Sequence, residues 1–549
     1  MTEQITQIVA MRRGPGGWSL GAAVIAALVL LPILTVVWLA LNPSQDIWHH
    51  LISTTLPRYL SNSVILMTAV GALSAVVGTV TAWLVTMYRF PGVRWLEWAL
   101  LMPLAIPAYV GAYALVDFLE YAGPVQTGLR QVFGWHSARD YAFPEIRSRW
   151  AAVLVISAAL YPYVYLLARA AFRELSAQSF DVARALGAGH VARFWRVGLP
   201  LARPAIAAGT AVVMMETVND FGVVEYFGVQ TLTTGIFTVW LEQGNAGGAA
   251  QIACVILTLV FVLVMLEKLS RRRSRFYALS RSESRPGRTL IRGGWGWLAF
   301  VLCTIPFAAG FVLPVAVLSG HAVGAADRWA DPDLARATLH TLVTGGAAAV
   351  LTVGGALFLV YGVRLSGRVL PRFLMPATLV GYAAPGAVLG LGLLLPLAWF
   401  DNRVADLWLA ITGTDPGLIL TGSAAAIVLA YTVRFFAIAQ GATDAAMGRV
   451  SPSLPMAARA LGRTAGGALS AIYLPMMRGS LATALLLVFV DCVKELPATL
   501  LLRPFNYNTL ATRVYEQASL ERIGDAAPAA LLVTFVGLTA VAILARANR

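Results

Sequence analysis

The chain has 549 residues, of which 58% are hydrophobic and only 12% are charged, and its mean hydropathy is +0.72. A soluble protein carries roughly a quarter charged residues, so this composition excludes an ordinary soluble fold and favours a chain that lies in a bilayer. The formal charge of +14 does not require a nucleic-acid partner, because membrane proteins retain Lys and Arg on their cytoplasmic face.

Apolar runs of about 17–25 residues, long enough to cross a bilayer as helices, recur along the chain. The first run follows Arg12 and Arg13 and is too long for the apolar core of a signal peptide, which has roughly 7–15 residues. We therefore expect an all-α integral membrane protein with twelve spans, at 18–41, 63–87, 95–118, 151–172, 204–224, 249–267, 296–318, 340–363, 373–398, 417–440, 479–499 and 526–545.

Lys and Arg are distributed unevenly among the segments between these spans. Nine lie in 268–292 and five lie in 173–203, whereas 223–249 contains none. Basic residues gather on the cytoplasmic side of membrane proteins. The pattern therefore predicts that the two basic segments and both termini are cytoplasmic.

The two halves of the chain resemble each other at an offset of 275 residues. Ala183-Arg184-Ala185-Leu186-Gly187 is repeated as Ala458-Arg459-Ala460-Leu461-Gly462, and Leu199-Pro200 is repeated as Leu474-Pro475. Such self-similarity indicates an internal duplication. An even number of spans per repeat gives both repeats the same orientation, so we expect two six-helix repeats.

Both repeated segments fall in a cytoplasmic loop between the fourth and fifth span. In each copy the sequence predicts a short helix ended by glycine, followed about ten residues later by Leu-Pro at the start of a helix. We interpret the loops as two rigid docking elements for a two-fold partner. The alternative is a loop that merely kept its shape after duplication.

These loops resemble the EAA loop of binding-protein-dependent ABC importer permeases, which has an acidic-Ala-Ala triplet, then glycine, then Ile-x-Leu-Pro. The matching positions of the first loop are Asp181, Val182, Ala183, Gly187, Val197, Leu199 and Pro200. Those of the second are Met456, Ala457, Ala458, Gly462, Ile472, Leu474 and Pro475. Asp181 replaces the usual glutamate, and Met456 carries no charge, so the two docking surfaces are expected to be unequal.

In this family each loop supplies a coupling helix that docks on a cytoplasmic ATPase. The resemblance implies that role for Asp181, Ala183, Arg184, Gly187, Leu199, Pro200, Met456, Ala458, Arg459, Gly462, Leu474 and Pro475. The chain itself is not expected to be an enzyme. A P-loop needs Gly-Lys-Ser/Thr, and the only lysines, Lys268 and Lys494, are followed by Leu and Glu.

A second resemblance concerns the cargo. Residues 494–505 and 508–515, followed by Ala518-Ser519, resemble the ferric-iron permeases of this superfamily, in which two halves of about 275 residues are fused. The resemblance implies a type I ABC importer permease with a first repeat at 1–267 (loop 176–203), a basic cytoplasmic linker at 268–292 and a second repeat at 293–549 (loop 450–478). Thiamine and phosphonate permeases share this layout and remain alternatives.

Four acids lie within the predicted spans at the same offset. Glu216 corresponds to Asp491 and Asp220 to Glu495, and each repeat spaces its two acids four residues apart, which predicts one helical face. An ionised acid in the membrane costs on the order of 3 kcal/mol, so these groups should face a polar interior. We hypothesise that Glu216, Asp220, Asp491, Lys494 and Glu495 line the translocation pathway. In the alternative, Lys494 and Arg503 neutralise the acids and fix the packing.

The expected partners are a cytoplasmic ABC ATPase dimer, a periplasmic substrate-binding protein and the lipid bilayer of a bacterial inner membrane, with no nucleic acid. We expect no cofactor on this chain, ATP on the partner subunit, and no fixed metal site. The rival hypothesis is an ion-coupled secondary transporter. It accounts for the spans and the acids, but not for two similar cytoplasmic loops with Leu-Pro at fixed spacing.

Overall fold

The computed structural model describes residues 17–43, 47–175, 177–272, 288–366, 369–379, 381, 384–451 and 453–547. Within these residues the chain is almost entirely helical, and its single sheet is a parallel pair of two-residue strands. The predicted all-α fold is therefore confirmed.

The first repeat comprises α2 (Gly17–Leu41), α3 (Trp48–Ser53), α4 (Leu56–Met87), β1 (Tyr88–Arg89), α5 (Val93–Ala99), η1 (Met102–Ala105), α6 (Ala108–Leu119), α7 (Pro124–Phe133), α8 (Arg149–Glu174), α9 (Ala177–Ala185), α10 (His190–Arg193), η2 (Phe194–Gly198), α11 (Leu199–Asn219), α12 (Gly222–Tyr226), α13 (Leu232–Phe237), η3 (Thr238–Glu242) and α14 (Ala246–Arg272). The second repeat comprises β2 (Thr289–Leu290), α15 (Gly294–Phe307), η4 (Ala308–Val312), α16 (Leu313–Gly324), η5 (Ala326–Ala330), α17 (Pro332–Ser366), α18 (Val369–Ala377), α20 (Gly386–Thr412), α21 (Ala425–Gly448), α22 (Ser453–Ala460), α23 (Ala465–Ala468), η6 (Leu469–Tyr473), α24 (Leu474–Val493), α25 (Pro497–Leu502), α26 (Leu510–Ser519) and α27 (Ile523–Ala547).

Among the described residues, eleven helices are long and apolar enough to cross a membrane. A twelfth crossing results if Val93–Ala105 and Ala108–Phe133, which meet at an angle of 95°, form one broken span. The break lies at Pro107. Ile106 before it is extended (φ −102°, ψ 124°), because a proline disfavours helical geometry in the preceding residue. The third predicted span is thus a bent pair of helices rather than one straight helix.

The duplication is visible element by element. α10 and α23 begin and end 275 residues apart, as do the π-helical turns η2 and η6. The helices that precede each loop, α8 and α21, and those that follow it, α11 and α24, agree at this offset to within one residue at both ends. The correspondence first seen in a few short matches therefore extends from α8 to α11 in the first half and from α21 to α24 in the second.

The chain forms two compact units, each of which combines segments of both repeats. Unit 1 comprises 1–46, 236–254 and 332–513, and unit 2 comprises 47–235, 255–331 and 514–549. In unit 1, α2 of the first repeat packs on α17, α18 and α20 of the second, with Trp18 stacked on Phe358 at 4.5 Å between ring centroids. In unit 2, α15 of the second repeat packs on α5, where Trp95 meets Phe307 at 5.1 Å. The first helix of each repeat therefore joins elements of the other repeat.

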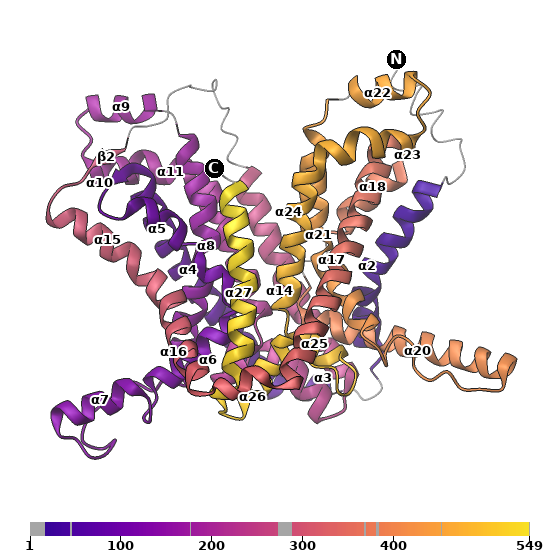
Figure 1. Cartoon of the computed structure of the whole chain (residues 1–549), viewed down its shortest axis with the longest axis horizontal. Helices are drawn as coiled ribbons and strands as arrows, with labels where there is room; N and C mark the ends of the chain where they lie inside the picture. Colours follow the sequence, from indigo (N-terminus) through magenta and orange to yellow (C-terminus); the bar gives the residue numbers. More distant parts are fainter. Residues whose placement is uncertain are drawn as a thin grey trace. The chain divides into compact units, whose positions relative to one another are not determined.

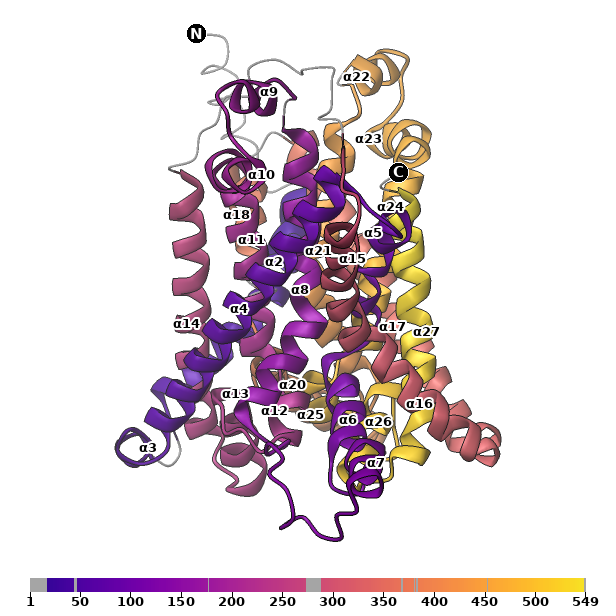
Figure 2. The same cartoon turned by 90° about the vertical axis from the view of Figure 1, so that its left-hand side faces the viewer.

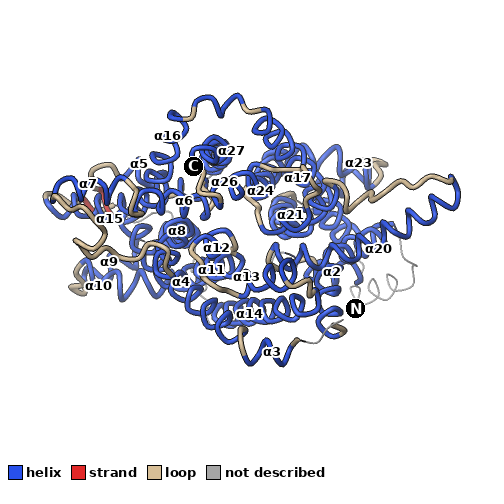
Figure 3. The backbone as a smooth tube through the Cα atoms, turned by 90° about the horizontal axis from the view of Figure 1, so that it is seen from below, coloured by secondary structure: helices blue, strands red, loops and turns tan. Residues whose placement is uncertain are grey.

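Within unit 2, α8 lies between α4, α6 and α11 (Figure 3). Its inward face is built from fully buried aromatic side chains, including Tyr161, Tyr165 and Phe172. α9 and α10 lie at one end of these long helices, and α7 and α12 lie at the other (Figures 1 and 2). In unit 1, α22 and α23 lie at one end of α24, and α25 lies at the other (Figure 1). Each unit thus presents one repeated loop at one end.

Candidate functional site: two repeated loops and the membrane acids

The two repeated loops, called loop 1 (176–203) and loop 2 (450–478), have the same backbone path. Loop 1 contains α9 and α10, and loop 2 contains α22 and α23. Of the residues predicted to couple to an ATPase, Asp181, Ala183 and Arg184 lie in α9, and Met456, Ala458 and Arg459 lie in α22. The side chains of Asp181 and Arg459 lie outside the described part of the structure.

A glycine in left-handed geometry ends the first helix of each loop. Gly187 has φ +80° and Gly462 has φ +81°. The following N–H reaches back five residues in both copies, from Ala188 to the carbonyl of Ala183 and from Arg463 to that of Ala458, at 2.9 and 3.0 Å. These bonds satisfy carbonyls at the helix end, and glycine adopts the required backbone geometry without strain. The predicted glycine stop is confirmed in both loops.

Leu-Pro lies inside a longer helix rather than at its start. Leu199 and Pro200 begin α11, but α10 and η2 precede them without a break, so that one continuous helix runs from His190 to Asn219. Loop 2 repeats this arrangement around Leu474 and Pro475. A proline has no N–H for the helical ladder, and the π-helical turn directly before it accommodates the missing bond. The expectation that a helix begins at Leu-Pro holds for α11 and α24 themselves, but each of them continues a helical segment that begins about ten residues earlier.

Both loops expose large apolar side chains. Leu186 is 83% exposed and Leu461 is 85% exposed at equivalent positions, and Val182 and Met456 are also exposed. Arg184 is exposed beside them. Apolar side chains grouped on a loop at the end of a helical bundle are typical of a surface that binds another protein.

An aromatic cluster packs between loop 1 and the long helices of unit 2. Trp83 on α4 is buried, and its ring lies 5.2 Å from the ring of Phe172, 6.0 Å from that of Phe180 on α9 and 5.2 Å from that of Phe194. A Cβ at Gly198 would overlap the Trp83 ring, so glycine permits this close approach. Trp83 thereby joins both helical pieces of loop 1 to the bundle.

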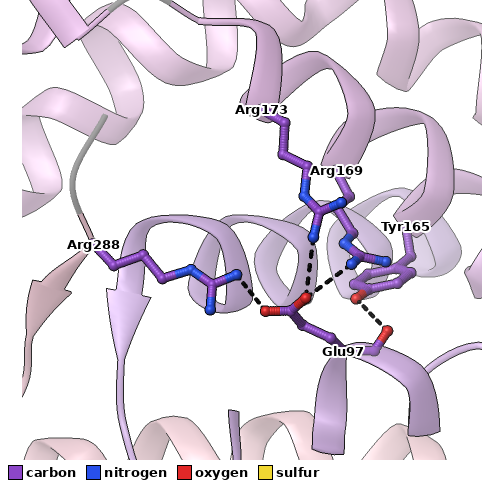
Figure 4. A network of polar contacts seen from close by, with 5 residues as sticks. All are labelled: Glu97, Tyr165, Arg169, Arg173 and Arg288. Carbon is purple, nitrogen blue, oxygen red and sulfur yellow. Dashed lines mark hydrogen bonds and ion pairs between the residues drawn. The ribbon is translucent and has the colours of Figure 1, made fainter. Parts of the chain in front are cut away.

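Glu97 forms a second support for loop 1 (Figure 4). Its carboxylate, on α5, accepts hydrogen bonds from Arg169 at 2.9 Å and Arg173 at 3.0 Å, both on α8, and from Arg288, which directly precedes β2. The hydroxyl of Tyr165 donates to the Glu97 carbonyl at 3.0 Å. Charge-assisted bonds of this kind are strong where water is excluded, and the Glu97 side chain is only 10% exposed.

This network was not predicted from the sequence, although a signal was available. Glu97 lies in the predicted span 95–118 and Arg169 in the predicted span 151–172, and charges inside spans indicate a partner or a function. The 275-residue offset points only to acids that have an acid at the equivalent position of the other repeat, and Glu97 is not one of them. Position 372, the equivalent of Glu97, is an arginine, so the comparison of repeats did not reveal it.

Loop 2 rests on different contacts. Tyr361 on α17 donates to the carbonyl of Ala465 at 2.6 Å, and its ring meets Trp18 of α2 and Tyr473 of η6, each at 5.4 Å. The pair Arg364–Asp444, at 2.7 Å, joins α17 to α21. Asp444 occupies the position equivalent to Arg169, so the sign of the charge is reversed between the repeats, and the Asp444 side chain is 45% exposed whereas that of Arg169 is 7% exposed.

The membrane acids do not share helical faces as expected. α11 ends at Asn219 and α24 at Val493, so Asp220 and Glu495 lie just beyond their helices. Asp220 accepts hydrogen bonds from the N–H groups of Val223 and Val224, at the start of α12. Glu495 is 4% exposed and accepts from the N–H groups of Ala498 and Thr499 in α25. The expectation that the two acids of each repeat share one helical face was wrong, because Asp220 and Glu495 lie beyond the ends of α11 and α24. Their carboxylates accept hydrogen bonds from N–H groups in the first turn of α12 and α25.

The remaining predicted pathway residues are half-buried. Glu216 lies within α11, and Asp491 on α24 forms an ion pair of 2.7 Å with Lys494. Arg503, considered as a neutralising partner, bonds to the side chain of Asn508. Arg434 approaches Glu495 at 3.9 Å. No group of three His, Cys, Asp or Glu side chains that could hold a metal ion occurs among the described residues.

Comparison with known proteins agrees with this architecture. Residues 74–275 match the profile of a family described as "Binding-protein-dependent transport system inner membrane component". The Fe(3+)-transport system permease protein FbpB 2 of Haemophilus influenzae is 26% identical over 486 residues, which cover 87% of this chain and 88% of that protein. The molybdenum permease ModB and the sulfate permease CysT of Escherichia coli are each 27% identical, over 36% and 37% of this chain and 86% and 71% of their own lengths.

The matched segment includes loop 1 and the helices on both sides of it, and the alignment with FbpB 2 extends over both repeats. The chain is a multi-pass membrane protein, and it is similar to the permeases of binding-protein-dependent transport systems.

Proposed function

We propose that this chain is the transmembrane subunit of an ATP-driven importer for ferric iron in a bacterial inner membrane. A separate cytoplasmic ATPase dimer drives it, and a periplasmic binding protein delivers the cargo. In this topology both termini and both loops are cytoplasmic, the repeats extend over 1–267 and 293–549, and 268–292 is the linker, of which residues 273–287 lie outside the described part of the structure.

The observation that carries the proposal is the pair of loops with equal backbones and exposed apolar tips, one in each unit. A partner that moves both loops needs two rigid segments with the same backbone geometry, which we call levers. Gly187 and Gly462 fix the end of each lever, and the continuous helices through Pro200 and Pro475 lead from the loops to the membrane acids. ATP binding to the partner would open the path outward, and hydrolysis would reset it, which requires two global states that the nucleotide favours differently.

Ferric iron is proposed as the cargo because FbpB 2, named as an Fe(3+) permease, aligns over both repeats. The segments 494–505 and 508–515 resemble ferric-iron permeases as well. Ferric iron is a hard cation, which prefers oxygen ligands, and carboxylates along the path suit its transient passage. Thiamine and phosphonate remain alternatives, as do the oxyanions named for the molybdenum and sulfate relatives.

Glu216, Asp491 and Lys494 are the proposed pathway residues that remain half-buried on their helices. Asp220 and Glu495 retain a proposed pathway role in addition to beginning α12 and α25. Glu216→Gln combined with Asp491→Asn should abolish uptake while the complex with the ATPase still assembles. The exposed acid Asp333 in the first turn of α17 provides the matched control, Asp333→Asn, which should transport normally. Normal uptake by the double variant would refute the pathway role.

Each repeat also carries an arm at the end of its unit opposite the loop (Figure 1). In unit 2 the arm includes α7, where Tyr141 donates to Gln126 at 2.6 Å. In unit 1 it is the far end of α20, where Asp401 accepts hydrogen bonds from Leu420 and Thr421 and holds the returning chain. We propose that these arms receive the binding protein on the periplasmic side.

The cargo is tested by the ATPase activity of the complete complex in liposomes. Ferric iron, molybdate, sulfate, thiamine and phosphonate are each supplied with a cognate binding protein. The proposal predicts that only the iron-loaded binding protein stimulates hydrolysis. Stimulation by another cargo and not by iron would show that this other compound is the cargo. The proposed role as an ABC permease would be unaffected.

A further inference from the structure

Glu97 links two stretches of chain that are far apart in the sequence. Its carboxylate binds Arg169 and Arg173, one turn apart on α8, through one oxygen, and Arg288 through the other (Figure 4). Arg288 lies in the basic linker, at the point where the described chain resumes before β2. One acid therefore serves three guanidinium groups, and each of them contributes to its stabilisation.

The chain around Arg288 is attached at two further places. β2 pairs in parallel with β1, so that Thr289 lies opposite Tyr88 and Leu290 opposite Arg89, and the N–H of Ile291 donates to the carbonyl of Arg89 at 3.0 Å. The helix that follows, α15, packs on α5 through Phe307 and Trp95. The start of the second repeat is thus fastened to β1 and α5 within unit 2.

The same carboxylate fixes the base of loop 1. Arg173 is one residue from the end of α8, and α9 begins at Ala177. Arg169 is buried and Arg173 is partly buried, so the last turn of α8 cannot rotate or separate from α5 without breaking charge-assisted bonds to Glu97, of which the bond to Arg169 is shielded from water. Any displacement of loop 1 that moves the end of α8 therefore also moves Glu97 and Arg288.

We infer that Glu97 is a positioning residue for the transport cycle, and that Arg288 makes the base of loop 1 and the first strand and helix of the second repeat (β2 and α15) move as one body. This inference rests on the proposed function for its consequence, the coupling of ATP hydrolysis to transport. The second repeat lacks the arrangement, since Arg372 and Asp444 occupy the positions of Glu97 and Arg169. The network of Glu97 with Arg169, Arg173 and Arg288, which we call the latch, is specific to loop 1.

Arg288→Gln is the informative variant, because it leaves the buried pair of Glu97 and Arg169 intact and should fold. Arg292→Gln is its matched control, an exposed arginine four residues further along the same segment. Arg288→Lys keeps the charge and should restore most of the behaviour of the unaltered chain. Glu97→Gln removes all three ion pairs and should have the largest effect, but it leaves Arg169 without its counter-charge.

The first measurement is hydrogen exchange of the full chain in detergent, without any partner. Arg288→Gln should raise exchange at 88–90 and 289–291 by roughly tenfold, because these segments open locally once the Arg288–Glu97 ion pair is lost, whereas 169–175 keeps its own two bonds to Glu97. Arg292→Gln should exchange like the unaltered chain. Equal exchange in Arg288→Gln and Arg292→Gln would overturn the latch, whatever the partner of this protein is.

The second measurement uses the reconstituted complex with its ATPase. The complex with Arg288→Gln should assemble with the ATPase and keep its basal rate of ATP hydrolysis. The amount of cargo transported per ATP should fall roughly tenfold, which is within the range of allosteric coupling between sites. Faster exchange with unchanged transport per ATP would reduce the latch to a structural contact and overturn the positioning role. If the unaltered chain bound no ATPase, the proposed function would fail, whereas the exchange result would still decide the latch.

Discussion

Loops 1 and 2 share their backbone and differ in what supports it. Loop 1 rests on Trp83 and on the Glu97 network, both within the α4–α5–α8 body. Loop 2 rests on Tyr361, which contacts the loop backbone and packs against Trp18 of the first repeat. Backbone features that depend on one or two residues, such as a glycine stop, persisted after duplication. The side chains below them diverged, even in the sign of the charge.

This difference indicates that the two loops do not respond equally to the same force. Loop 1 is joined to a charged network that includes the linker, and loop 2 is joined to a helix, α2, from the opposite end of the sequence. The docking residues also differ, since Asp181 lies at the position of Met456. A partner with two identical subunits would therefore meet two unequal surfaces.

The largest expected effect comes from removing the aromatic support of loop 1. Trp83→Ala should destabilise unit 2 by about 3–5 kcal/mol, because it deletes a buried ring that contacts four others. Phe358→Ala, the equivalent change below loop 2, should cost less, since that side chain is only half-buried. Thermal unfolding of the full chain in detergent compares the two variants. A greater loss in Phe358→Ala would reverse the comparison.

The glycine stops should behave alike in both loops. Gly187→Val and Gly462→Val should each cost about 1–2 kcal/mol locally, since left-handed backbone is strained for any residue with a Cβ. No atom lies close enough to either glycine to add a clash, so the asparagine variants should recover part of the loss. Hydrogen exchange at 182–188 and 457–463 measures this, and unequal costs would show that the loops are not equivalent levers.

A smaller effect is expected at the second helix of each loop. Thr464 caps α23 by accepting a hydrogen bond from Gly467 at 3.1 Å, whereas the equivalent position in loop 1 is Gly189. Thr464→Ala should weaken that helix by about 1 kcal/mol, and Gly189→Ser should strengthen α10 by a few tenths of a kcal/mol. Exchange of the amides at 465–468 and 190–193 tests both changes, and stabilisation in Thr464→Ala would contradict the capping role.

The smallest effect concerns the missing acid of loop 2. Met456→Glu restores the usual charge on an exposed position, and such surface changes generally alter the stability of a protein by less than about 0.5 kcal/mol. We expect ATPase binding to change by less than about threefold. A large gain in affinity would show that the partner recognises an acid in both loops and that loop 2 lost it.

The repeat, the glycine stops and the membrane fold were predictable from sequence, because each depends on composition or on residues close together in the chain. Glu97 was predictable only as a charge inside a span that needs a partner, and Trp83 was not predictable, since their partners lie up to 191 positions away and have no counterparts in the second repeat. Glu495 was misplaced on its helix for a local reason. Pro497 has no N–H to bond the carbonyl of Val493, so α24 cannot continue through Glu495 in the normal ladder.

The central claim is that an external ATPase drives this chain through loops 1 and 2. The direct test reconstitutes the purified chain in liposomes, with and without the cytoplasmic ATPase, and measures cargo uptake with ATP or with an imposed ion gradient. The account predicts uptake only when both the ATPase and ATP are present, and loss of uptake in Gly187→Val and Gly462→Val. Uptake driven by the gradient alone, with no ATPase present, would contradict it.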